Sequence, residues 1–199
     1  MNKSHLGDAY DYVKKSLLEY FVLEKNQILT IPLFTEPFIV ENNDLAFYSH
    51  ITGSSQTDII KDPFLPANRD SYLVRALEKI NHHLVVFIDP DTGLSQNLGR
   101  LQNKYLNLEE VVPFASRAKN VIIYDQSFSN SRSEAKHDNM RTKLHFFFEN
   151  SIFGFYVDLQ ASFLFLSKSE QLIQDLQNDL VSKHFVLDER IITLPKNNC

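Results

Sequence analysis

The sequence predicts an α/β protein built on a doubly wound, mostly parallel sheet with an antiparallel edge. Segments with strand character alternate with segments of helical periodicity, which is typical of parallel sheets covered by helices on both faces. Two of the strands, 84–89 and "NVIIYD" at 120–125, are almost continuously apolar and therefore read as buried on both faces. Two adjacent apolar runs late in the chain, at 153–159 and 161–167, indicate the antiparallel edge. With 199 residues, the chain suits a single domain spanning 1–199.

The first third of the chain contains one helix, one strand and a long irregular stretch. Residues 9–25 carry apolar side chains at helical spacing, and Asp8 is a candidate N-cap. A short strand follows in "QILTIPLF". Residues 36–66 read as an irregular insertion with one possible short helix near 44–50. Because this stretch is too long for an ordinary connection, it is interpreted as a lid or binding loop.

The remaining elements follow the helix–strand alternation to the end of the chain. Helices are predicted at 69–80, 108–117, 131–149 and 169–182, the last one capped by Ser169. The closing segment "HFVLDERIITL" predicts one or two short strands.

Composition excludes several classes of protein. Twenty basic residues against 25 acidic ones give a net charge of −5, which argues against a surface coated for nucleic acid, although a local basic groove remains compatible. The one cysteine, Cys199, allows no disulfide within the chain. The apolar runs are too short to span a bilayer, so the sequence predicts a soluble, cytoplasmic protein with no membrane partner.

The strongest candidate for a site lies where an apolar strand stops in "DPDTG". Asp89 ends the strand, Pro90 and Asp91 follow, and Asp125 ends the next buried strand. Ligands of open α/β sheets bind outside the carboxyl ends of the strands, so both acids are expected to face one crevice. The alternative is a plain turn, in which the proline sets the bend and Gly93 permits a positive φ.

Two polar groups on predicted helices are further candidates for binding. Asp8, Asp11 and Lys14 stand at the head of the first helix, where they could hold a phosphate or a carboxylate of a cofactor. The alternative is a solvated, capped first turn.

The second group lies on the helix predicted at 131–149. Arg132, His137 and Arg141 make this the most basic local patch, which could bind a polyanionic substrate. The alternative is an ordinary solvated face. No histidine and carboxylate spacing predicts a zinc site.

Two stretches resemble parts of a known family. "GDAYDYVKKSLL" resembles the N-terminal G-N-x-x-D-x-x-K-H element of the large-subunit ribosomal RNA adenine methyltransferases, and "VVFIDPDTGL" resembles their strand end, hhhDPPY. The overall run also resembles a group of bacterial and phage proteins that carry a DPD-x-G motif. The motif's second proline is Asp91 here and its aromatic residue is Thr92, and no glycine-rich loop follows the first strand.

The resemblance implies a methyltransferase-like Rossmann fold that uses S-adenosylmethionine. It implies that Asp89 and the carbonyl of Pro90 accept hydrogen bonds from the exocyclic amine of a base. Gly7, Asp11 and Lys14 match the N-terminal element, which the resemblance assigns to cofactor binding. Phe34, Tyr124 or Phe128 could supply the aromatic ring that the motif lacks.

Three functions are therefore open. The first is a methyltransferase-fold protein that acts on or binds a nucleic-acid base or nucleotide. The second is a magnesium-dependent phosphoryl or phosphodiester hydrolase that uses Asp89 and Asp91, since carboxylates at a strand end suit that ion. The third is a non-catalytic, phage- or defence-related binding module.

Overall fold

The structure, a computed structural model, describes residues 9–23, 27–34, 42–82, 85–96, 104–128, 133–159 and 162–195. Within these ranges it contains six α-helices and two sheets. The helices are α1 (Ala9–Leu23), α2 (Asn42–Thr52), α3 (Arg69–Glu78), α4 (Leu108–Arg117), α5 (Ser133–Glu149) and α6 (Glu170–Ser182). The strands are β1 (Ile28–Pro32), β2 (Val85–Asp89), β3 (Gly93–Ser95), β4 (Tyr105–Asn107), β5 (Asn120–Asp125), β6 (Phe153–Val157), β7 (Ser162–Ser167) and β8 (Ile191–Ile192).

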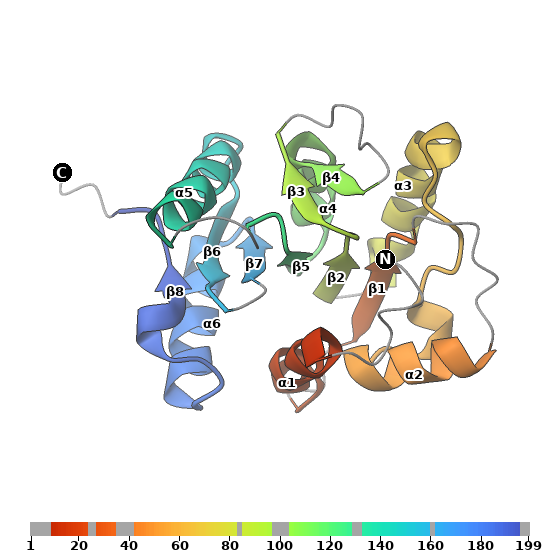
Figure 1. The fold of residues 1–199 in the computed structure, drawn as a ribbon, viewed down its shortest axis with the longest axis horizontal. Helices are drawn as coiled ribbons and strands as arrows, with labels where there is room; N and C mark the ends of the chain where they lie inside the picture. The colour runs from red at the N-terminus through yellow and green to blue at the C-terminus, as the bar shows by residue number, and fades with distance from the viewer. Residues whose placement is uncertain are drawn as a thin grey trace.

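The main sheet has six strands in the order β1-β2-β5-β7-β6-β8, which Figure 1 shows side by side from right to left. The first three are mutually parallel, whereas β7 runs antiparallel to both of its neighbours and β8 antiparallel to β6. The sheet is therefore mixed. The expected antiparallel edge is found only in the short β8, because β7 lies inside the sheet.

The composition of β7 fits its position inside the sheet. Its core residues, 163–166, are apolar without alternation and fully buried, so the strand needs cover on both faces and a neighbour on both edges. The chain provides this by folding β7 back from β6 and inserting it beside β5.

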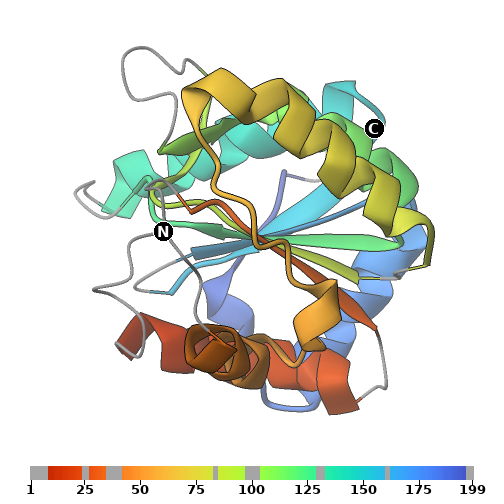
Figure 2. The same ribbon diagram turned by 90° about the vertical axis from the view of Figure 1, so that its right-hand side faces the viewer.

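Helices cover both faces of the sheet, as Figure 2 shows. The helices α3, α4 and α5 lie on one side, and α1, α2 and α6 lie on the other. The strand side chains alternate between the two layers: Val86 and Ile88 belong to the first core cluster, and Val85 and Phe87 to the second. The predicted α/β class is confirmed in this coarse sense.

The described part of the predicted insertion at 36–66 packs against the outer edge of β1. The helix α2 is longer than the predicted 44–50, and Ile59 forms an isolated parallel bridge with Thr30. The side chains of Ile59, Ile60 and Phe64 are buried. This portion belongs to the hydrophobic core, because its apolar side chains close the exposed edge of the sheet. Its role as a lid or binding loop stays a prediction.

The helices α4 and α6 begin where their capping residues predict. Asn107 caps α4 with a capping box, its side chain accepting from the N–H of Glu109 at 3.1 Å, and the helix has the predicted bounds. Ser169 caps α6 as predicted, accepting from the N–H of Leu172 at 3.2 Å.

The small parallel pair of β3 and β4 was not predicted, because three-residue strands carry too little periodicity. The candidate N-cap Asp8 lies outside the described residues.

Candidate functional site

A buried cluster surrounds Asp89 at the carboxyl end of β2. The ammonium of Lys14, from α1, donates to Asp89 Oδ2 at 2.8 Å and to Asp11 Oδ1 at 3.1 Å. The hydroxyl of Tyr48, from α2, also donates to Asp89 Oδ2. Lys14 Nζ lies 4.2 Å from the centre of the Tyr124 ring, a favourable cation–π contact. We call Asp11, Lys14, Tyr48 and Asp89 the Asp89 cluster.

Charge pairing makes this burial tolerable. A lone ammonium removed from water is very costly, so buried lysines are found paired or neutral. Burial lowers the pKa of Lys14, but Asp89 and Asp11 together outweigh it and hold the pKa above its ordinary value. Burial and the negative charge of Asp89 raise the pKa of Tyr48 well above its ordinary value. The cluster therefore consists of a charged lysine between two carboxylates, with a neutral tyrosine as the second donor to Asp89.

A second cluster surrounds Asp125 at the end of β5. Asp125 Oδ2 accepts from Lys143 at 2.8 Å and from the Tyr156 hydroxyl at 2.9 Å. Its Oδ1 accepts from the Ser127 hydroxyl at 2.6 Å and from the Leu94 N–H at 3.1 Å. Burial lowers the pKa of Lys143, and its one carboxylate partner offsets this only in part. We call Asp125, Lys143 and Tyr156 the Asp125 cluster.

The two clusters lie on opposite faces of the sheet. Ile88 pairs with Ile123 across β2 and β5, so Asp89 is level with Tyr124 and Asp125 stands one residue further along. Because side chains alternate along a strand, that offset turns Asp125 to the other face. Asp89 consequently meets α1, and Asp125 meets α5. The expectation that both acids face one crevice is wrong.

The structure joins two of the sequence-derived candidates and separates others. Asp11 and Lys14, chosen for the head of the first helix, meet Asp89, chosen for the end of a strand 75 residues after Lys14. Pro90 is buried directly after Asp89, and Asp91 is partly exposed in the turn that leads to β3. Gly7 and Arg132 lie outside the described residues.

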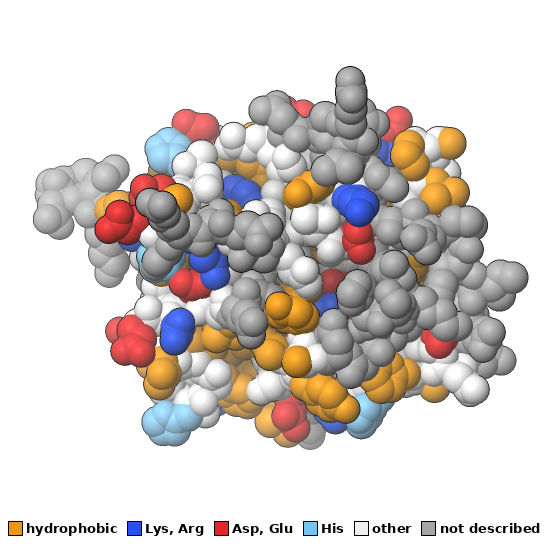
Figure 3. Space-filling model, in the orientation of Figure 1, with side chains coloured by type: hydrophobic (Ala, Val, Ile, Leu, Met, Phe, Trp, Pro, Cys, Tyr) orange, Lys and Arg blue, Asp and Glu red, His pale blue; other side chains and the backbone are white. Residues whose placement is uncertain are grey.

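The basic side chains of α5 have acidic partners. His137 Nε2 lies 2.7 Å from Asp158 Oδ2, Lys136 pairs with the same carboxylate, and Arg141 lies 3.4 Å from Asp138. Burial raises the pKa of Asp158, but hydrogen bonds from Lys136 and His137 outweigh it and lower the pKa. On the face shown in Figure 3, basic and acidic side chains are interspersed. These pairs account for the charges on α5 without a ligand, and substrate binding by His137 and Arg141 stays a prediction.

Sequence reasoning missed both tyrosines that complete the clusters. Tyr48 lies in the stretch interpreted as irregular, and Tyr156 lies in a strand where an aromatic residue indicates only core. A tyrosine buried beside a carboxylate has no local signature, because its partner is distant along the chain. Of the three rings proposed to replace the missing aromatic, Tyr124 lies beneath Lys14, Phe34 packs 6.2 Å from the Tyr48 ring, and Phe128 lies under Lys143.

The described residues offer little support for a metal or for S-adenosylmethionine. Among them, no group of three or more His, Cys, Asp and Glu side chains could hold a metal ion. At Asp89, the Lys14 ammonium already supplies the positive charge. After β1, the side chains of Leu33 and Phe34 are buried where a cofactor loop needs a bare backbone, and the sequence has no glycine between Gly7 and Gly53. These residues do not fit the cofactor.

None of the helices in the described ranges has the length and apolar character needed to cross a membrane. Compared with known proteins, the chain matches no family model, no curated protein and no solved structure.

Proposed function

We propose that this protein binds a nucleic-acid base or nucleotide that carries an exocyclic amine, at the Asp89 cluster, without transferring a methyl group. The observation that carries the proposal is the position of Lys14, whose ammonium bridges Asp11 and Asp89 at 3.1 and 2.8 Å. Asp11 and Lys14 belong to one of the two motifs that resemble the adenine methyltransferases, and Asp89 belongs to the other. A relationship between the two motifs requires that they form one site, and these contacts support it.

The strand order also supports a methyltransferase-like sheet. The resemblance implies a doubly wound sheet with a reversed strand near its end. In this chain β7 is reversed and stands between β5 and β6, late in the sequence.

The geometry of Asp89 suits recognition of an amine. Lys14 and Tyr48 both donate to Oδ2, and neither uses Oδ1. A carboxylate accepts through both oxygens, so an exocyclic amine that reaches Oδ1 can donate a hydrogen bond to it while Oδ2 remains held by the protein. The carbonyl of the buried Pro90 follows directly and is the second acceptor that the resemblance assigns.

Chemistry beyond binding has less support. The residues after β1 do not fit S-adenosylmethionine, so no methyl-transfer step is derived. The hydrolase hypothesis places a divalent ion between Asp89 and Asp91, but the ammonium of Lys14 already lies 2.8 Å from Asp89 and would repel that ion.

Binding of nucleosides by titration calorimetry tests the proposal. Adenosine and cytidine, which carry the amine, should bind at least tenfold more tightly than inosine and uridine, because a buried acceptor without its donor is costly. Asp89→Asn should remove this preference, since the amide has an NH2 donor in place of one carboxylate oxygen and cannot accept from Lys14 on one side and from the ligand amine on the other. The matched control is Asp125→Asn, which changes an equally buried carboxylate on the opposite face and should keep the preference. Circular dichroism must show that both variants are folded.

S-adenosylhomocysteine provides the decisive comparison. This compound carries the same exocyclic amine as adenosine, so we expect its thermal shift to be no larger than that of adenosine at the same concentration; a ligand at a hundred times its dissociation constant stabilises by about 2.7 kcal/mol. A shift clearly larger than that of adenosine and dependent on Lys14 would mean that the amino-acid part is bound as well, and would overturn the conclusion that methyl transfer is absent. Equal affinity for adenosine and inosine would remove the role assigned to Asp89.

A further inference from the structure

A hollow lies on the outer flank of β1, between α3 and the segment that covers the edge of the sheet. Its volume is about 350 Å³, at the small end of the range of small-molecule sites. Ile59 and Ile60 form its wall, and both are held in place by the sheet: Ile59 bridges Thr30, and the Ile60 N–H donates to the Thr30 carbonyl at 3.0 Å. The hollow therefore has a rigid apolar wall.

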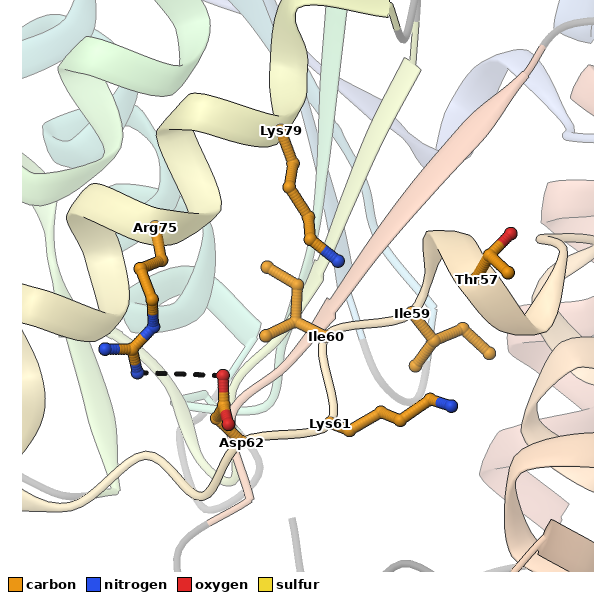
Figure 4. A pocket seen from close by; sticks show the side chains of 7 residues that line it. All are labelled: Thr57, Ile59, Ile60, Lys61, Asp62, Arg75 and Lys79. Atoms are coloured by element: carbon orange, nitrogen blue, oxygen red, sulfur yellow. Dashed lines mark ion pairs between the residues drawn. The ribbon is translucent and has the colours of Figure 1, made fainter.

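Three cationic side chains line this hollow. Arg75 extends from α3, Lys79 directly follows the end of that helix, and Lys61 extends from the opposite segment with its ammonium directed away from Arg75 (Figure 4). The one acidic residue of the lining is Asp62. The lining thus has a net charge of +2 in a protein whose net charge is −5, so this local excess of positive charge runs against the overall balance of the molecule.

The ion pair between Arg75 and Asp62 across the hollow is loose. Arg75 Nη2 lies 3.6 Å from Asp62 Oδ2, beyond hydrogen-bonding distance, and the two side chains are 49% and 58% exposed. Exposed pairs of this kind contribute about 0–1 kcal/mol. A doubly charged phosphate can exchange for Asp62 at little cost, because the guanidinium binds phosphate oxygens in a bidentate fashion.

We propose that this hollow binds the phosphate group of a small phosphorylated ligand. Arg75 contacts the phosphate in a bidentate manner, Lys61 and Lys79 contribute charge from either side, and the apolar part of the ligand lies against Ile59 and Ile60. The hollow is small and one of its walls is apolar, which favours a small ligand over the continuous backbone of a nucleic acid. This site is separate from the Asp89 cluster and does not depend on the function proposed for it.

The test uses phosphate compounds that lack a base. Ribose 5-phosphate and pyrophosphate are titrated into the full chain, and a double variant, Lys61→Gln with Lys79→Gln, should weaken binding at least tenfold. Arg75→Lys keeps the charge but removes the planar fork, so we expect an intermediate loss of about threefold to tenfold. Lys168→Gln is the matched control, an exposed lysine after β7 that should change affinity less than twofold.

Each outcome decides the proposal. Binding of ribose 5-phosphate that weakens in the double variant and not in Lys168→Gln supports it. Failure of both compounds to bind at millimolar concentration, or binding unchanged by the double variant, overturns it. A short single-stranded oligonucleotide that binds through the same lysines while ribose 5-phosphate does not would show that the phosphate belongs to a polymer, and would also overturn it. Adenosine lacks phosphate, so its binding at the Asp89 cluster is unaffected by these results.

Discussion

At the scale of residues, the clusters of Asp89 and Asp125 differ by one carboxylate, and this difference changes the direction in which the pKa of the buried lysine is shifted. Each acid ends a strand and accepts from one lysine and one tyrosine. Lys14 has a second acid, Asp11, and its pKa is raised, whereas Lys143 has only Asp125 and its pKa is lowered. Burial disfavours the ammonium in both places, and the number of carboxylates decides the direction of the shift.

Removing one tyrosine hydroxyl at a time separates stability from binding. Tyr48→Phe and Tyr156→Phe each delete a buried hydrogen bond to a carboxylate, so each should lower the free energy of unfolding by about 1–3 kcal/mol. Only Tyr48→Phe should also weaken nucleoside binding, because Tyr156 serves the opposite face of the sheet. Urea unfolding and calorimetry on the same samples provide both quantities. Equal effects of the two variants on binding would contradict the assignment of the site.

Position 93 requires glycine for two reasons, its positive φ and the close approach of the Asp125 side chain. It has a φ of +123°, and a Cβ built there would lie 2.1 Å from Asp125 Oδ1. Gly93→Ala should therefore cost at least about 1–3 kcal/mol from overpacking, in addition to backbone strain. Chemical denaturation measures this loss. A variant as stable as the parent would mean that the contact between β3 and Asp125 is not tight.

At the scale of elements, Glu110 links α4 to α3 and β4. Its carboxylate accepts from the backbone N–H of Asn107 at 2.7 Å and from Arg69 at 2.5 Å through both Nε and Nη2. Arg69 also donates to the carbonyl of Tyr105 at 3.0 Å and lies 4.7 Å from the centre of the Phe64 ring. One side chain thereby completes a helix cap and neutralises a buried arginine.

Substitutions in the first turn of α4 should rank by this double role. Glu110→Ala removes the carboxylate that neutralises the buried Arg69 and should cost about 3–5 kcal/mol. Asn107→Ala removes only the cap and should cost about 1 kcal/mol. Glu109→Ala, an exposed acid in the same turn, should stay within about 0.5 kcal/mol of the parent in thermal or urea unfolding. If Glu110→Ala costs no more than Asn107→Ala, the link to α3 does not stabilise the fold.

At the scale of the whole molecule, buried tyrosines make stability fall at alkaline pH. Burial is the main cause that raises the pKa of Tyr48, Tyr72 and Tyr156. In the unfolded chain these hydroxyls ionise near pH 10, so above that pH ionisation lowers the free energy of the unfolded state but not that of the folded state. Stability is fully present below pH 10 and falls by about 1.4 kcal/mol per pH unit for each tyrosine, or roughly 4 kcal/mol per unit for three.

The two buried lysines act in opposite directions over the same range. The raised pKa of Lys14 adds stability that is present below about pH 10.4 and is lost as the pH rises through its folded pKa. The lowered pKa of Lys143 means that burying its charged form costs stability at lower pH. This cost disappears as the pH rises and the side chain loses its proton, which offsets part of the stability lost through the tyrosines. Urea unfolding between pH 8 and 11 measures the slope. Tyr156→Phe should reduce it by about one third, and Tyr12→Phe, at a 65% exposed position, should not change it; a slope insensitive to Tyr156→Phe would count against this account.

The sequence by itself determined the features that depend on neighbours along the chain. The buried strands, the bounds of α4 and the cap of α6 follow from apolar periodicity and from single capping residues. It also placed Asp89 at a strand end and put Asp11 and Lys14 on one helix, since that placement needs only local spacing. These local signals were sufficient to identify three of the four residues of the Asp89 cluster.

Only the tertiary structure decided how these parts meet. The offset between β2 and β5 depends on pairing between distant segments, and it alone turns Asp125 away from Asp89. The insertion of β7 beside β5 and the approach of Tyr48 to Asp89 are likewise contacts between segments far apart in the chain. Periodicity reports which face of an element is apolar, but it contains no information on which element covers that face, and so the partners of each carboxylate came from packing.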